Sequence, residues 1–182
     1  MESAYSGPEP CNLTKQSVMQ LAESVARQLE YKPGTPMPPI VEQMGGKIIF
    51  QNFWDLDSTM DGSIQIDGVG DFKIYLGRSS SHERDRFTIA HEIGHYILHF
   101  LYPLKILKQD QRPLKVARYG SGRTESEAHW FAAAFLMPES AFRNVFFEND
   151  GDPMAIAKHF DVSVSAAKIR ADSLGLTGEL VH

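Results

Sequence analysis

The chain has 182 residues, of which 42% are hydrophobic and 23% charged, and a formal net charge of -5. This composition is typical of one ordinary globular domain, and no apolar run is long enough to span a membrane. The acidic balance argues against direct nucleic-acid binding, and a single cysteine, Cys11, predicts a cytoplasmic protein without disulfides.

Residues 1–12 lack the basic and apolar regions of a secretory signal, and their Ser, Gly and Pro content predicts a disordered N-terminal tail. A first helix is expected from about Thr14 to Glu30, because apolar residues recur there at helical spacing behind a good N-cap. The segment 32–39 contains four prolines and predicts an extended connector. A short helix is expected after it, at 40–44.

Three short strands are expected next along the chain. The segments 47–51, 63–66 and 72–76 are rich in β-branched and aromatic residues, and glycine- and aspartate-rich turns separate them. The sequence therefore predicts a small three-stranded antiparallel sheet.

The next helix carries the strongest functional signal of the chain. Apolar residues between Phe87 and Leu101 recur every three or four positions, which indicates an amphipathic helix. Ser80 and Glu83 fit a capping box at its start, and Pro103 is expected to end it.

This helix contains the pentapeptide His91-Glu92-Ile93-Gly94-His95. Residues four apart share one face of a helix, so the imidazoles of His91 and His95 can bind one metal ion. Glu92 is placed to take a proton from a water molecule at that ion. The pentapeptide therefore predicts a metallopeptidase, provided that a third ligand exists.

Candidates for the third ligand lie at the start of a second strong helix, expected over 125–137. Thr124 and Glu127 fit a capping box there, which gives Glu127 a structural role. Catalytic zinc takes three protein ligands and keeps one position for water. Glu125 and His129 are four residues apart, and spacing alone leaves both open as the third ligand.

The C-terminal part predicts only helices. A helix at 139–147 precedes a turn cluster, and two further helices at 154–160 and 163–174 are joined by a short link that resembles a helix-turn-helix. Residues 151–182 carry three basic side chains (Lys and Arg) against four acidic ones, too little positive charge for a DNA-reading helix. We expect this element to support folding or to dock a protein.

Two long segments resemble the signature of the ImmA/IrrE metallopeptidases. They are RDRFTIAHEIGHYILH at 84–99 and ESEAHWFAAAFLMP at 125–138. Two shorter pieces agree with the family, Met60-Asp61-Gly62 and Phe160-Asp161-Val162-Ser163, and the similarity covers roughly residues 14–176.

The resemblance implies roles for individual residues. His91, His95 and Glu125 match the family's zinc ligands, and Glu92 matches its catalytic base. His129 stands where the family has Asn or Asp, so it stays a second candidate ligand. Family members typically cleave a helix-turn-helix repressor of the Xre type, and others belong to toxin-antitoxin-like pairs.

The sequence as a whole predicts an α+β, mostly helical, zincin-like protein. Its expected parts are the tail at 1–12, a zincin-like metallopeptidase domain at 13–148, and a helix-turn-helix-like element at 149–182 packed on that domain. The predicted function is a cytoplasmic endopeptidase with one catalytic Zn²⁺ that cleaves a specific protein partner, a helix-turn-helix repressor, without binding membranes.

Two points stay open at this stage. The donor that stabilises the oxyanion of peptide hydrolysis has four candidates, Tyr96, Tyr102, Tyr119 and His129. The rival function is a non-catalytic, metal-containing regulator or toxin-antitoxin component. In that case His129 would complete a closed site of four ligands.

Overall fold

The computed structural model describes residues 4–51, 63–78, 80–117 and 122–177, so the predicted Met60-Asp61-Gly62 turn lies outside the described residues. Within this part of the chain the strands are β1 (Gly46–Gln51), β2 (Ser63–Gly68), β3 (Asp71–Gly77) and β4 (Leu114–Val116). The helices are α1 (Lys15–Gln28), α2 (Met37–Gln43), α3 (His82–His95), α4 (Tyr102–Lys105), α5 (Arg123–Leu136), α6 (Glu139–Glu148), α7 (Pro153–Phe160) and α8 (Val164–Ser173). A π-helical turn, η2 (Tyr96–Leu101), joins α3 to α4.

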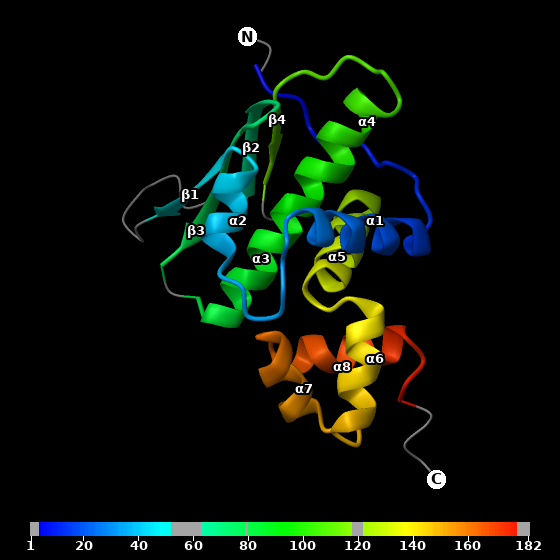
Figure 1. Ribbon diagram of the computed structural model, residues 1–182. Coiled ribbons are helices and arrows are strands. Elements are labelled where there is room, and N and C mark those ends of the chain that lie inside the picture. Colours follow the sequence, from blue (N-terminus) through cyan, green and yellow to red (C-terminus); the bar gives the residue numbers. More distant parts are fainter. Residues whose placement is uncertain (1–3, 52–62, 79, 118–121, 178–182) are drawn as a thin grey trace.

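Helix α3, which carries the pentapeptide His91–His95, lies between the sheet and the pair α1 and α5 (Figure 1). Its residues Ile89 and Ile93 are buried in the same core as Phe131 and Phe135 of α5. The alternation of buried and exposed residues along β3 turns one face of the sheet toward this core. The polar pentapeptide is thereby held in the interior, facing α5.

The sheet has four strands in the order β1-β3-β2-β4, and its pairing is mixed. β2 pairs antiparallel with both β3 and β4, whereas β1 pairs parallel with β3. The three predicted strands are present, but the prediction of a three-stranded antiparallel sheet is wrong in strand number and in the direction of β1. β4 has three residues, too few for a recognisable alternation, and β1 is not joined to β3 by a turn that could indicate their direction.

Several predicted helix boundaries change in the structure. Thr14 does cap α1, since its side chain accepts the N–H of Ser17. α3, however, is capped by Ser81, and α5 begins after Gly122, which has a φ of 95°. The capping boxes predicted at Ser80 and at Thr124 are therefore both wrong.

Residues 4–12, predicted as part of a disordered tail, are docked on the domain instead. The N–H of Ser6 donates to the carbonyl of Pro113 at 2.9 Å, and the N–H of Lys115 donates to the carbonyl of Ser6 at 3.0 Å. Ser6 thus forms a β-bridge beside β4. Farther along this segment, the N–H groups of Cys11 and Asn12 donate to a buried carboxylate of α5 that is described below.

The C-terminal helices lie at the end of the molecule where α3 begins (Figure 1). Buried Arg170 of α8 donates through Nε to the carbonyl of Met137 at 3.0 Å, and its Nη2 lies 3.6 Å from Glu23 of α1. Buried Arg86 of α3 donates to the carbonyl of Asp161, between α7 and α8, at 3.0 Å. These two arginines tie α7 and α8 to the central helices. Among the described residues, no helix has the length and apolar character needed to cross a membrane.

Candidate metal centre

Three side chains from two helices converge at the centre of the fold. The Nε2 atoms of His91 and His95, both on α3, lie 3.1 Å apart. Glu125 of α5 places Oε2 at 3.1 Å from Nε2 of His91 and Oε1 at 3.1 Å from Nε2 of His95. The structure thus brings together the three residues that the sequence analysis predicted as metal ligands.

The donor set of this cluster fits a divalent cation. Zinc bonds of about 2.0–2.1 Å in a tetrahedron separate ligand atoms by about 3.3 Å, close to the observed spacing. The cluster brings two imidazole nitrogens and two carboxylate oxygens close together. A cation among them would stabilise this arrangement, because all four atoms can offer it a lone pair. Among the described residues, buried His91 Nδ1 and Glu92 Oε2 also have no hydrogen-bond partner.

The protonation states of the cluster suit metal binding. Burial lowers the pKa of His91, and it lowers the pKa of His95 to about 4, so both imidazoles are neutral near pH 7 and carry a lone pair. Burial alone would raise the pKa of Glu125. The close contacts with the imidazoles of His91 and His95 outweigh that effect and hold the pKa of Glu125 well below its usual range.

Glu92 lies beside the cluster on α3 and is 2% exposed. Burial, and to a smaller extent the negative charge of Glu125, raise the pKa of Glu92 well above its usual range. A carboxyl group with a raised pKa binds a proton more strongly than an ordinary surface glutamate. Glu92 is thus a buried carboxyl group beside the cluster with an increased affinity for protons.

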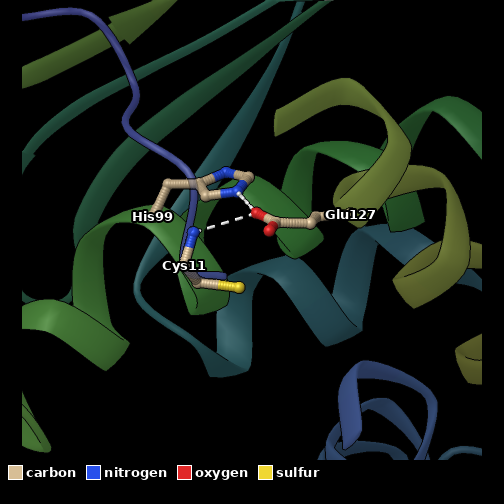
Figure 2. Close-up of side chains that lie close together, drawn as sticks. All are labelled: Cys11, His99 and Glu127. Atoms are coloured by element: carbon tan, nitrogen blue, oxygen red, sulfur yellow. Dashed lines mark hydrogen bonds and ion pairs between the residues drawn. The ribbon is translucent and has the colours of Figure 1, made fainter. Parts of the chain in front are cut away.

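A chain of hydrogen bonds runs from His95 away from the cluster. Nδ1 of His95 lies 2.9 Å from Nδ1 of His99, and Nε2 of His99 lies 2.8 Å from Oε2 of Glu127 (Figure 2). All three side chains are buried. η2 begins one residue after His95 and contains His99, so this π-helical turn sets where the second imidazole lies.

This chain determines the tautomer of His95. A carboxylate only accepts hydrogen bonds, so Nε2 of His99 carries the proton and its Nδ1 becomes an acceptor. Nδ1 of His95 must then donate, which leaves the lone pair on Nε2, the atom that faces His91 and Glu125. A hydrogen-bonded partner of this kind orients the imidazole of a metal ligand and increases its basicity.

Glu127 is held by four donors from three parts of the chain. Oε2 accepts from His99 and from the backbone N–H of Cys11 at 3.0 Å, as Figure 2 shows. Oε1 accepts from the N–H of Asn12 at 3.0 Å and from Nε of Arg123 at 2.9 Å. Burial alone would raise the pKa of Glu127, but these bonds outweigh it and lower that pKa to about 2.

Close packing of α3 on α5 brings Glu125 to the histidines. A Cβ added at Gly94 would lie 3.1 Å from Cβ of Phe131 and 3.3 Å from Cα of Ala128. Only glycine lets the two helix backbones approach this closely without displacement. The glycine within the pentapeptide therefore has a packing role in addition to its place in the motif.

His129 lies at the exposed edge of the cluster, one turn after Glu125 on α5. Its Nδ1 donates to the carbonyl of Glu125 at 3.0 Å, and its ring meets the ring of His91 edge-on, with centroids 4.6 Å apart. Possible ligand atoms of His91, Glu125 and His129 lie within 4.8 Å of one another, a looser set than the 3.1 Å triad. His129 is thus close to the cluster without being part of its tightest set.

Tyr96 and Tyr102, two of the other candidates for an oxyanion donor, do not line the cavity at the cluster. Tyr96 is 2% exposed, and its hydroxyl accepts the N–H of Gly70 at 2.8 Å, under the sheet. Tyr102 does not line the cavity at the cluster, and Tyr119 lies outside the described residues. His129 is the candidate, among those the structure describes, that lines this cavity.

The cavity at the cluster has a volume of about 250 Å³ and is lined by all four predicted site residues. The sequence predicts that His99, one turn beyond His95, supports the ligands or lies at the surface, and the structure places it beside His95. Sequence reasoning missed the role of Glu127, which it assigned to a capping box. A histidine one turn beyond a predicted ligand was the available signal, but its partner lies on another helix.

Comparison with known proteins adds three findings. A family model for the IrrE N-terminal-like domain, a peptidase family, matches residues 65–172. A solved structure described as a Mycobacterium tuberculosis transcriptional regulator matches with a TM-score of 0.59 and 15% identity, over 86% of this chain and 46% of that chain. This chain thus spans about half the length of that protein, and the likeness is one of fold. No curated protein matches the chain significantly.

Proposed function

Because the chain belongs to the peptidase family of the IrrE N-terminal-like domain, we propose that it is a zinc-dependent endopeptidase that cleaves a specific protein partner. Membership agrees with the resemblance of the two long motifs to ImmA/IrrE metallopeptidases. A peptidase family implies a polypeptide substrate. The metal, the catalytic residues and the identity of the substrate are the finer parts of the proposal.

One observation carries the proposal. The Nε2 atoms of His91 and His95 and the carboxylate of Glu125 are mutually spaced at 3.1 Å, with Glu92 buried beside them. Two imidazoles and one carboxylate are a ligand set that suits catalytic zinc, which keeps a further position for water. We assign these three residues as the ligands.

The residues divide the chemistry between them. The bound ion supplies Lewis acidity to the scissile carbonyl and to the attacking water. Glu92 accepts the proton that the water loses as its oxygen bonds to the carbonyl carbon, and then donates it to the leaving amide nitrogen. His129 lines the same cavity, and its Nε2 is the candidate donor for the oxyanion when the ring is protonated, because Nδ1 already donates to the carbonyl of Glu125. His99 and Glu127 keep the lone pair of His95 directed at the ion.

We further propose that the polypeptide is a helix-turn-helix repressor. This step comes from the ImmA/IrrE resemblance, and the fold likeness to a protein described as a transcriptional regulator is compatible with it. Purified repressors encoded near the gene, incubated with zinc-loaded protein, should yield one pair of fragments whose masses define the cut. Intact repressors beside a positive peptidase result would remove this step alone.

Glu92→Gln tests the enzymatic proposal. The substitution keeps shape and hydrogen-bonding capacity but removes the base, so cleavage should fall by at least about 10²-fold while bound zinc stays near one equivalent. Glu148→Gln, at the exposed end of α6 and outside the cavity at the cluster, is the matched control and should retain full activity. Undiminished cleavage by Glu92→Gln would rule out the proposed base.

A non-catalytic regulator is the second candidate, and the position of His129 favours it. If His129 joins the other three residues around the ion, the site is closed and no position remains for water. His129→Ala separates the two functions. A catalytic site of three ligands keeps its metal affinity in this variant, whereas a closed structural site loses it severalfold or more.

A further inference from the structure

A second and larger cavity opens off the cavity at the metal cluster. Its volume is about 680 Å³, compared with about 250 Å³ for the first. Arg84, Phe87, Thr88 and His129 line both cavities, so the two share one wall along α3 and the start of α5. A polypeptide whose scissile bond lies at the cluster therefore has this second cavity directly beside it.

The second cavity is an apolar groove between α1, α5 and α8. We define the apolar groove by Met19, Phe87, Trp130, Ala133, Met137 and Ile169. Trp130, Ala133 and Met137 follow one another along α5 and form its floor. Ile169 of α8 is 64% exposed and stands at its rim. Pockets of this size with mostly apolar walls are typical ligand sites.

The dimensions of the groove match an extended polypeptide. Ala133 and Met137 lie four and eight residues beyond His129, which at 1.5 Å per residue is about 6 and 12 Å along α5. An extended chain advances about 3.3 Å per residue. The groove floor therefore lies beside substrate residues roughly two to four positions away from the bond at the cluster.

Charged groups at the rim also suit a polypeptide. Two basic side chains, Lys15 and Arg84, and one acidic side chain, Glu83, line the groove. Buried Arg170 also lines it, but this side chain is already bonded to the carbonyl of Met137. The two basic side chains can pair with acidic groups or backbone carbonyls of a bound chain, while the floor takes an apolar side chain. This arrangement of an apolar floor with a polar rim is common in recognition sites.

We propose that the apolar groove binds a bulky apolar side chain of the substrate, two to four residues from the scissile bond, and so selects where the substrate is cut. This inference rests on the proposed function, because its occupant is the polypeptide that the metal site hydrolyses. It assigns a specificity role to Ala133 and Ile169, neither of which touches the metal cluster.

The test uses binding of metal-directed probes to the zinc-loaded full chain. Acetohydroxamate serves as the reference compound. Two series of four-residue peptides carry a hydroxamate group, one series at the N-terminus and the other at the C-terminus. Each position is Ala, Leu or Phe in turn, and dissociation constants are measured by calorimetry. In one series, Leu or Phe two to four residues from the hydroxamate should tighten binding on the order of tenfold over Ala.

Variants locate the preference in the groove. Ala133→Leu fills the floor and should abolish the preference for Leu over Ala, and Ile169→Ser at the exposed rim should weaken it severalfold without disturbing the fold. Ile106→Ser is the matched control, because Ile106 is 65% exposed and lies outside the groove. It should leave every dissociation constant unchanged.

Each outcome has a defined meaning. Equal affinity for Ala, Leu and Phe at every position, or a preference that survives both groove variants, overturns the inference while binding of acetohydroxamate preserves the proposed function. No binding of acetohydroxamate to zinc-loaded protein refutes an open metal site, and the inference falls with it. A dimer that Ile169→Ser dissociates would show that a second copy of the chain covers the groove, which also refutes the inference.

Discussion

Replacing Glu127 by Gln is the most informative perturbation of this site, because it changes one charge and almost no volume. Each carboxylate oxygen accepts two donors, Oε2 from His99 and the N–H of Cys11, and Oε1 from the N–H of Asn12 and from Arg123. A glutamine amide has only one acceptor oxygen. Its NH₂ group must therefore face two donors, whichever way the amide is turned.

The structure indicates which pair is lost and at what cost. The side chain of Arg123 is 44% exposed and can turn to solvent, whereas His99 is completely buried. The amide oxygen should therefore keep His99 and Cys11. Losing a charged acceptor at the remaining donors costs about 2–3 kcal/mol of unfolding free energy. The neutral amide also holds His99 and, through it, His95 more weakly, which predicts a loss of metal affinity of about tenfold or more.

Two measurements on the same protein check this prediction. Urea unfolding of metal-free protein gives the loss of stability, and competition with a chromophoric zinc chelator gives the loss of affinity. Glu125→Gln, two residues away on α5, is the matched comparison and should lose far more metal affinity and less metal-free stability. Unchanged values in Glu127→Gln would refute the proposed chain of hydrogen bonds. A loss of metal affinity equal to that of Glu125→Gln would mean that Glu127 is itself a ligand.

Three further outcomes follow from the site. The pKa of Glu127 in the folded protein is lowered from 4.5 to about 2. The ionised carboxylate therefore stabilises the fold fully above about pH 5, and this stabilisation is lost as the pH falls toward 2. The free energies of urea unfolding of metal-free wild type and Glu127→Gln should converge over that range. His129→Ala should slow peptide cleavage by about 10²-fold, measured as kcat, with chelator competition showing unchanged zinc affinity. Gly94→Ala should lower the free energy of unfolding, measured by thermal unfolding, by at most about 2 kcal/mol. The added Cβ lies 3.1 Å from Phe131, which destabilises the packing, whereas alanine favours the helix. The variant should also bind zinc more weakly, because the contact moves Glu125.

The helices of the site could be predicted because their signals are local. The three- and four-residue periodicity around His91 and His95 requires no knowledge of the rest of the fold, and the structure places both on α3. The sheet was harder to predict because the pairing of its strands is not signalled by the local sequence. β4 shows no pattern of its own in three residues, and the parallel pairing of β1 with β3 depends on the path of the chain between β1 and β2.

The proposed metal ligands could be predicted from the sequence, whereas the contacts that orient them could not. The two histidines required a third ligand, spacing left Glu125 and His129 as candidates, and the resemblance to the ImmA/IrrE motifs singled out Glu125. Neither partner of His99 could be predicted, because the π-helical turn that positions this histidine has no recognised sequence pattern. The prediction of a disordered tail failed for a related reason. Its composition carries no sign of the carboxylate, more than a hundred residues away, that binds its backbone.

The docked N-terminal segment also explains how a charged carboxylate can remain buried so close to the metal cluster. A fully buried glutamate is costly unless its oxygens are satisfied, and His99 supplies only one of the four donors that Glu127 uses. Two of the other three are backbone N–H groups of Cys11 and Asn12, which side-chain substitution cannot remove. The negative charge that orients His99 and then His95 is thus maintained by the path of the chain itself, so the orientation of the His95 imidazole depends on where residues 11 and 12 are docked.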